Sequence, residues 1–341
     1  MQALVLALAF PLVLTVPATA ERMVTDSAGR EVALPDRVER VFPAGPPASV
    51  LVYALAPDKL TGWSRALRPE EREHVLPAVR DLPETGRLTG RGDTANLEVV
   101  LAAKPDLILD YGSVGGTYAS LADRVQAQTG VPYLLIDGRF VATTKGLRLA
   151  GEALGVPERA ADLARYAERV FADLDRALAE VPTERRPRDY LARGPDGLET
   201  GLRGSINTEI IERAGAVNVA DAGGDRQGIA QVQLEQVLLW NPDTIVTWDE
   251  RFHAAVQGNP AWAGVTAVRL GRVYLSPSLP FGWIDRPPSL NRLIGLRWLT
   301  GLLYPDRAAV DLSEETKAFY RLFYQVELDE PRLRRLLGGR P

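Results

Sequence analysis

Arginine and aromatic side chains occupy several short loops of this sequence, and such side chains can bind an anion or a metal chelate. A guanidinium offers a planar fork of N–H donors to carboxylate, catecholate or oxoanion oxygens, and an aromatic ring offers a rigid apolar wall. Any one arginine could instead be an ordinary solvated surface residue. The candidates in the first half are Arg91 (in TGRGDT), Tyr111 (in LDYGS) and Arg139 (in DGRF); those in the second half are Arg203, Trp248, Trp283, Asp285 and Arg286.

The segment 280–289, PFGWIDRPPS, is the most informative of these loops. Prolines bracket Trp283, Asp285 and Arg286 just before a helix expected over 289–301. An aromatic loop with a proline-fixed backbone is typical of a presented binding surface. Two plainer interpretations remain: a stiff plug over the core beneath it, and a simple ion pair between Asp285 and Arg286.

Composition excludes several kinds of site. The 341 residues include no cysteine and two histidines, so disulfides, thiolate metal sites and cysteine nucleophiles are excluded. A metal site built from imidazoles is not expected, nor is any resident cofactor. The net charge of −4 argues against nucleic-acid binding. The charged stretch 68–74, which contains His74, is expected to be a solvated helix start.

Enzyme motifs are also missing. The sequence contains no G-x-S-x-G, H-E-x-x-H or Walker loop. We therefore do not expect an enzyme. The alternatives from other classes are a secreted metal-free hydrolase, with carboxylates such as Asp110 and Asp249, and a structural interaction protein.

The N-terminus has the pattern of an export signal. The apolar run 3–16 is shorter than the roughly 20 residues that span a membrane, and Ala18-x-Ala20 suits signal peptidase. We expect a signal peptide over 1–20, with a buried core helix as the alternative. No cysteine follows it, so we expect no lipid anchor and a periplasmic protein that is not membrane-embedded.

One sequence unit occurs twice. LEVVLAAKPDLIL (97–109) and LEQVLLWNPDTIV (234–246) match at seven positions with a fixed offset of 137. Each copy predicts a short amphipathic helix, a turn at Pro105 or Pro242, and a buried strand. Two copies so far apart indicate two similar lobes.

The remaining pattern predicts an α/β protein with largely parallel sheets. A helix expected over 157–181 is long enough to join the lobes. We divide the chain into a signal peptide (1–20), an N-terminal lobe (21–142), an interlobe helical segment (143–186), a C-terminal lobe (187–306) and C-terminal helices (307–341). Strands are expected at 40–45, 59–64, 106–112, 132–137, 188–194, 243–249 and 272–277.

Four segments, together with the repeat, resemble class III periplasmic substrate-binding proteins of ABC importers, which serve ferric siderophores, haem, cobalamin and some oxoanions. The resemblance implies two Rossmann-like lobes joined by one long interlobe helix, with ligand bound between them and no chemistry performed. The segments are VTDSAGREVALPDRVERVF (24–42), GSINTEIIERAGAVNVA (204–220), WAGVTAVRLGRVYLSP (262–277) and LFYQVELDEPRLRRLL (322–337).

The resemblance also implies partners. Glu98 and Glu235 are similar to the family's docking glutamates, which meet arginines of the permease; otherwise they only favour their helix starts. The expected partners are a permease dimer with its ATPase and one small ligand, bound by a monomer. The ligand class expected first is a ferric siderophore-like chelate. The next is an oxoanion, molybdate or tungstate, and the third is cobalamin or haem.

Overall fold

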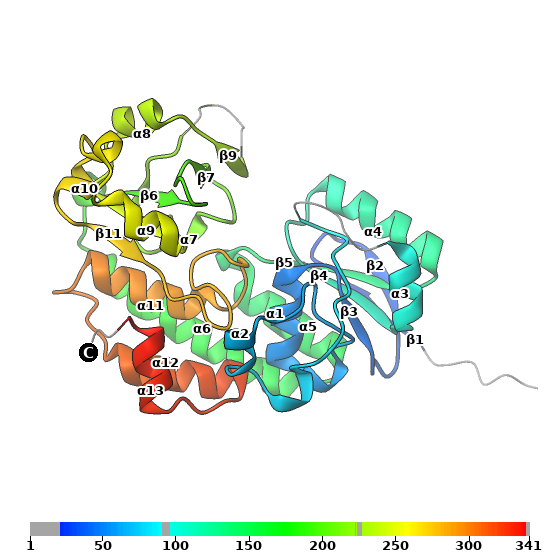
Figure 1. The fold of residues 1–341 in the computed structure, drawn as a ribbon. Coiled ribbons are helices and arrows are strands. Elements are labelled where there is room, and N and C mark those ends of the chain that lie inside the picture. Colours follow the sequence, from blue (N-terminus) through cyan, green and yellow to red (C-terminus); the bar gives the residue numbers. More distant parts are fainter. Residues whose placement is uncertain (1–20, 91–95, 222, 224–226, 339–341) are drawn as a thin grey trace, which may run out of the picture.

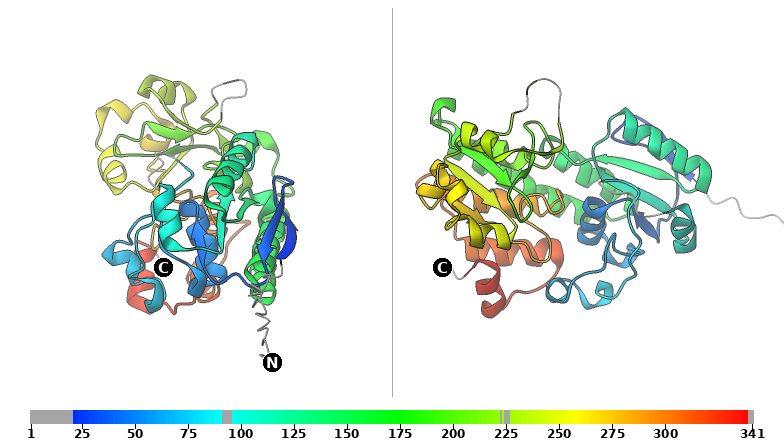
Figure 2. Two further views of the ribbon diagram at one scale, coloured as in Figure 1. Left: turned by 90° about the vertical axis from the view of Figure 1, so that its right-hand side faces the viewer. Right: turned by 45° about the horizontal axis from the view of Figure 1, so that its top comes forward.

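The computed structural model describes residues 21–90, 96–221, 223 and 227–338. The predicted signal peptide (1–20) and Arg91 lie outside the described residues. No helix in the described part of the chain is long and apolar enough to cross a membrane. Two α/β lobes stand side by side on a shared base of helices (Figures 1 and 2).

The N-terminal lobe is built on a three-stranded parallel sheet. Its strands β3 (Val41–Pro43), β4 (Leu107–Gly112) and β5 (Tyr133–Asp137) lie in that order. β4 and β5 are buried along almost their whole length because helices cover both sheet faces, and most of their side chains are apolar. Those helices are α1 (Pro46–Leu55) and α5 (Thr143–Leu154) on one face, and α3 (Leu97–Ala103) and α4 (Gly116–Thr129) on the other. The hairpin of β1 (Glu21–Thr25) and β2 (Glu31–Pro35) precedes the sheet.

The C-terminal lobe has a four-stranded parallel sheet of the same kind. The strand order is β11 (Val273–Leu275), β10 (Thr244–Thr247), β6 (Arg188–Ala192), β8 (Val217–Asn218). A small antiparallel pair, β7 (Glu199–Gly201) and β9 (Ile229–Gln231), lies beside it. The lobe's helices are α7 (Glu209–Arg213), α8 (Leu234–Trp240), α9 (Glu250–Val256) and α10 (Thr266–Arg269).

The sequence repeat is a structural repeat. α3 and β4 match α8 and β10, and both helices end on a left-handed residue, Lys104 (φ 45°) and Asn241 (φ 42°). The Asp106 carboxylate accepts the backbone N–H of Arg40 at 2.9 Å, and the Asp243 carboxylate accepts that of Arg188 at 2.9 Å. The lobes therefore share one local architecture, as the fixed offset predicted.

One long helix, α6 (Pro157–Leu178), joins the lobes as predicted, ending three residues early. It buries a stripe that includes Leu163, Val170 and Leu174. It packs so closely on α5 that a Cβ on Gly151 would lie only 2.2 Å from the Cβ of Ala160. The base is completed by α11 (Arg292–Leu303), α12 (Leu312–Phe319), a π turn (Tyr320–Tyr324) and α13 (Glu330–Leu336).

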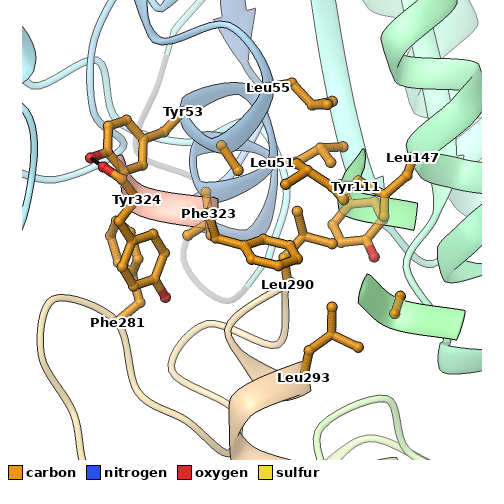
Figure 3. Packing of buried hydrophobic residues seen from close by; sticks show 14 of the residues in the cluster. Leu51, Tyr53, Leu55, Tyr111, Leu147, Phe281, Leu290, Leu293, Phe323 and Tyr324 are labelled. Atoms are coloured by element: carbon orange, nitrogen blue, oxygen red, sulfur yellow. Dashed lines mark hydrogen bonds between the residues drawn. The ribbon is translucent and has the colours of Figure 1, made fainter. Parts of the chain in front are cut away.

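The C-terminal helices close a core that continues from the first lobe into the base. The ring of Tyr324 stacks on Tyr53 at 6.1 Å between centroids and meets the edge of Phe281 at 5.5 Å. Figure 3 shows these rings beside leucines of α1 and α11. Residues 307–338 therefore belong to the core rather than forming a loose tail.

Two local predictions differ from the structure. The expected strand 59–64 forms only isolated parallel bridges, at Leu60 and Trp63. The stretch 68–74 is a helix start with five exposed residues, as expected, but Glu71 is 1% exposed and His74 is 3% exposed. Ion pairs with neighbouring arginines keep Glu71 charged despite its burial.

A buried guanidinium fixes the lobes to each other. Arg292, 1% exposed, donates to the carbonyl of Gly138 at 2.7 Å and to that of Ile206 at 2.8 Å, and pairs with Glu209 at 3.2 Å. Glu209 in turn accepts the backbone N–H of Phe140 at 2.9 Å. Residues 138–140 belong to the first lobe and 206–209 to the second, so these contacts form an interlobe junction.

We expect Arg292→Met to destabilise the protein by about 3–5 kcal/mol, because it leaves two carbonyls and a carboxylate without their donor. Urea denaturation measures the loss. The matched control is Arg307→Met, which removes only an exposed ion pair with Glu180 and should cost at most about 1 kcal/mol. Equal effects of the two substitutions would contradict the junction.

The fully buried Asp189 of β6, which pairs with Thr244 of β10, should make the stability of the protein depend on pH. Burial raises the pKa of Asp189 to about 7, although the Thr244 hydroxyl donates to its carboxylate at 2.6 Å. The folded chain therefore holds this proton more tightly than the unfolded chain, whose pKa is about 3.9. Stability from this group is full below about pH 4 and is lost as the pH rises to about 7.

Asp189→Asn should remove that part of the pH dependence, which is on the order of 4 kcal/mol. Chemical denaturation from pH 4 to 8 provides the measurement, with the exposed Asp306→Asn as control. A variant whose stability declines with pH as steeply as the wild type would refute the assignment.

Candidate functional site

Four arginines, Arg65, Arg68, Arg251 and Arg286, line a cavity of about 200 Å³ to which both lobes contribute. We call it the interlobe pocket. It lies beyond the carboxyl end of β10, the usual ligand position in α/β sheets. The first lobe contributes Arg65, Arg68 and Glu71, from α2 (Pro69–Arg72) and the loop before it; the second contributes Trp248, Asp249, Glu250, Arg251, Ser278, Pro280 and Arg286.

Glu71 holds the two arginines of the first lobe in place. Its buried carboxylate accepts from both terminal nitrogens of Arg65, at 2.7 and 2.8 Å, and from Nε of Arg68 at 2.9 Å. It also accepts the backbone N–H of Arg68 at 2.8 Å. Burial alone would raise the pKa of Glu71, but these donors lower it, so the carboxylate stays charged. Arg68 also pairs with Glu70 at 3.2 Å, and Arg65 also donates to the carbonyl of Ala66 at 3.0 Å. Both arginine side chains are 48% exposed and line the pocket, so a ligand can reach them.

Arg286 is held differently. Its guanidinium lies 4.4 Å from the centroid of the Trp248 ring, a cation–π contact. No carboxylate among the described residues lies within ion-pair distance of it. Burial, and then the positive charges of Arg65 and Arg68, lower the pKa of Arg286. An anion in the pocket would relieve this repulsion.

Two further carboxylates line the pocket without neutralising Arg286. The Asp249 carboxylate caps α9, accepting the backbone N–H groups of Arg251 at 3.0 Å and Phe252 at 3.2 Å. Glu250 follows in the first turn and is exposed. The fourth arginine of the lining, Arg251, lies 3.7 Å from the Asp249 carboxylate. The cationic side of the pocket is therefore the surface shared by Arg65, Arg68 and Arg286.

Asp285 fixes the loop that carries Arg286. It is 3% exposed, and it pairs with Arg193 at 3.1 Å rather than with Arg286. Asn207 donates to the same carboxylate at 3.3 Å. Arg193 also lies 5.7 Å from the Trp248 ring. The suggested ion pair between Asp285 and Arg286 is therefore absent among the described contacts. Asp285 instead pairs with Arg193, which packs on Trp248.

The other sequence candidates lie apart from the pocket lining. Arg139 pairs with Asp137 at 2.5 Å, and Arg203 pairs with Asp221 at 2.7 Å. Tyr111 (2% exposed) and Trp283 (fully buried) belong to the core. This differs from the cleft positions expected for them, because the strand and the loop that carry these rings turn them inward.

Sequence reasoning missed Arg65 and Arg68. Both lie next to the stretch 68–74, whose many charges suggested a solvated surface. The spacing of Arg65, Arg68 and Glu71 was the available signal, since residues three apart can share one carboxylate. In the described part of the chain, no three His, Cys, Asp or Glu side chains gather as a metal site.

Comparison with known proteins agrees with this architecture. Residues 48–279 match the family described as periplasmic binding protein. An ABC transporter solute binding protein from Sulfurospirillum deleyianum is 30% identical, with a TM-score of 0.84 over 93% of this chain and 99% of that chain.

A second relative is the molybdate-binding protein MolA of Haemophilus influenzae. It is 28% identical over 347 residues, covering 92% of this chain and 93% of that protein. Its structure with molybdate bound has a TM-score of 0.73 at 25% identity, covering 90% of this chain and 99% of that chain. The chain therefore belongs to the periplasmic binding protein family, as a class III solute-binding component of an ABC transporter.

Proposed function

We propose that this protein captures a small oxoanion of the molybdate or tungstate type in the interlobe pocket and delivers it to an ABC permease. The observation that supports this most is the guanidinium of Arg286, which lines the pocket with Arg65 and Arg68 and forms no ion pair with any described carboxylate. Charge-assisted hydrogen bonds from arginine suit oxoanion oxygens. The coarser role, solute binding without catalysis, is that of the family.

Pocket size favours an oxoanion over the ferric siderophore-like chelate that led the sequence analysis. The pocket holds about 200 Å³, whereas sites for drug-sized ligands occupy roughly 300–1,000 Å³. The name and bound ligand of MolA support the same choice. Among the residues predicted from sequence, Arg286 and Trp248 are retained as ligand-site residues. We add Arg65 and Arg68, with Glu71 as a positioning residue.

Export and docking complete the proposal. The protein is sent to the periplasm by the predicted signal peptide, without a lipid anchor. Glu98 and Glu235 meet arginines of a permease dimer, one from each lobe. Both glutamates are exposed, both lie in the first turn of a repeated helix, and neither forms an ion pair among the described residues.

Arg286→Gln should weaken molybdate binding by about tenfold to a hundredfold, because one charge-assisted hydrogen bond contributes about 1.5–3 kcal/mol. Isothermal titration with molybdate, tungstate, sulfate and a ferric hydroxamate measures both affinity and ligand class. Arg203→Gln, which alters an arginine outside the pocket lining, is the control. Tight binding of the hydroxamate alone, or unchanged molybdate affinity in Arg286→Gln, would contradict the proposal.

Charge reversal at both docking sites should abolish uptake. We expect cells with Glu98→Arg/Glu235→Arg to lose transport of labelled molybdate, while the purified variant binds molybdate like the wild type. Glu158→Arg serves as control, since it reverses another exposed first-turn glutamate and has a similar helix-dipole cost. Normal uptake by the double variant would rule out these docking residues.

A further inference from the structure

Leucine side chains on the two repeated helices, α3 and α8, remain exposed to solvent. Leu101 of α3 is 49% exposed, and Leu238 of α8 is 37% exposed. They are equivalent residues, since the repeat offset of 137 relates them. Leu239, next to Leu238, is 80% exposed. These three are among the few large apolar side chains that the described residues leave exposed.

Packing within the lobes buries Leu101 and Leu238 only in part. The neighbouring Val100 and Val237 are fully buried, and with Leu97 and Leu234 they pack α3 and α8 on their cores. The burial class is the same at every position when 96–110 is compared with 233–247. Both lobes therefore keep a leucine at the same partly exposed position, where it leaves apolar surface in contact with water.

Each exposed leucine shares a helix face with a docking glutamate. Glu98 and Leu101 are three residues apart on α3, and Glu235 and Leu238 are three apart on α8, so each pair lies side by side on its helix. Every lobe thus presents one free carboxylate beside one leucine, and Figure 1 shows α3 and α8 on different lobes. We call these pairs the lobe patches.

We propose that the lobe patches form a mixed apolar and acidic docking surface for a protein with two equivalent basic and apolar recesses, one per patch. This inference rests on the proposed delivery to a permease dimer, which has the required twofold repetition. The glutamates guide the encounter and set the register, and the leucines contribute burial that salt does not screen.

The two patches are not equal. Leu239 enlarges the second patch, whereas its counterpart in the first lobe is Ala102. More apolar area is therefore available on the C-terminal lobe. From this difference we infer that α8 contributes more to the affinity for the partner than α3, although both patches have a glutamate and a leucine at equivalent positions.

The test measures docking of ligand-loaded protein on its cognate permease–ATPase complex in nanodiscs, by biolayer interferometry at two salt concentrations. Leu238→Ser/Leu239→Ser should weaken docking by about tenfold or more, and Leu101→Ser should weaken it less. The matched control is Leu270→Ser, which alters a 55% exposed leucine of the C-terminal lobe outside the patches. Molybdate titration and thermal melting establish that each variant folds and binds.

Outcomes separate this inference from the docking role itself. Loss of docking in the leucine variants, with residual binding more salt-dependent than in the wild type, supports the lobe patches. Wild-type docking by all leucine variants, combined with failure of Glu98→Arg/Glu235→Arg, would overturn the apolar contribution and leave glutamate docking intact. Unchanged docking in both sets would overturn both proposals.

Discussion

The position of one buried charge determines how the two lobes face each other. Arg292 has no access to water, so its cation must be compensated by protein oxygens, and those oxygens come from loops of both lobes. Separating the lobes at this point would break the two hydrogen bonds and the ion pair by which Arg292 holds them together. Together with α6, whose apolar stripe is buried along much of its length, the interlobe junction fixes the distance across which the pocket forms.

The arginines of the interlobe pocket are held by neighbouring side chains although their charges repel one another. The buried Glu71 holds Arg65 and Arg68, and the face of Trp248 holds Arg286. Trp248 is supported by Arg193, which Asp285 anchors from within the protein. Binding by preformed donors limits the entropy lost on binding, which is how a small ligand with few atoms can be held tightly.

The sequence predicted the parts of the fold that repeat or have a period. The offset between 97–109 and 234–246 anticipated two similar lobes, and the apolar spacing over 157–181 anticipated α6. It could not show that Glu71 is buried, because a run of charges has the same pattern whether it faces water or a set of tertiary partners. Arg292 was missed because its partners, in residues 138–140 and 206–209, lie on segments that only the tertiary fold brings together. Arg65 and Arg68 are a different case, because their partner Glu71 is close in sequence and only its burial was hidden. Tyr111 and Trp283 are the reverse case: aromatic residues near strand ends can point into the core as easily as into a cleft.

We propose that an oxoanion binds between Arg65, Arg68 and Arg286. The decisive experiment is a crystal structure of the protein grown with tungstate, with diffraction recorded across the tungsten absorption edge. We expect one strong anomalous peak in the interlobe pocket, within hydrogen-bonding distance of guanidinium groups from both lobes. A peak elsewhere, or a pocket that stays empty while the protein binds a bulky chelate, would rule out this binding site.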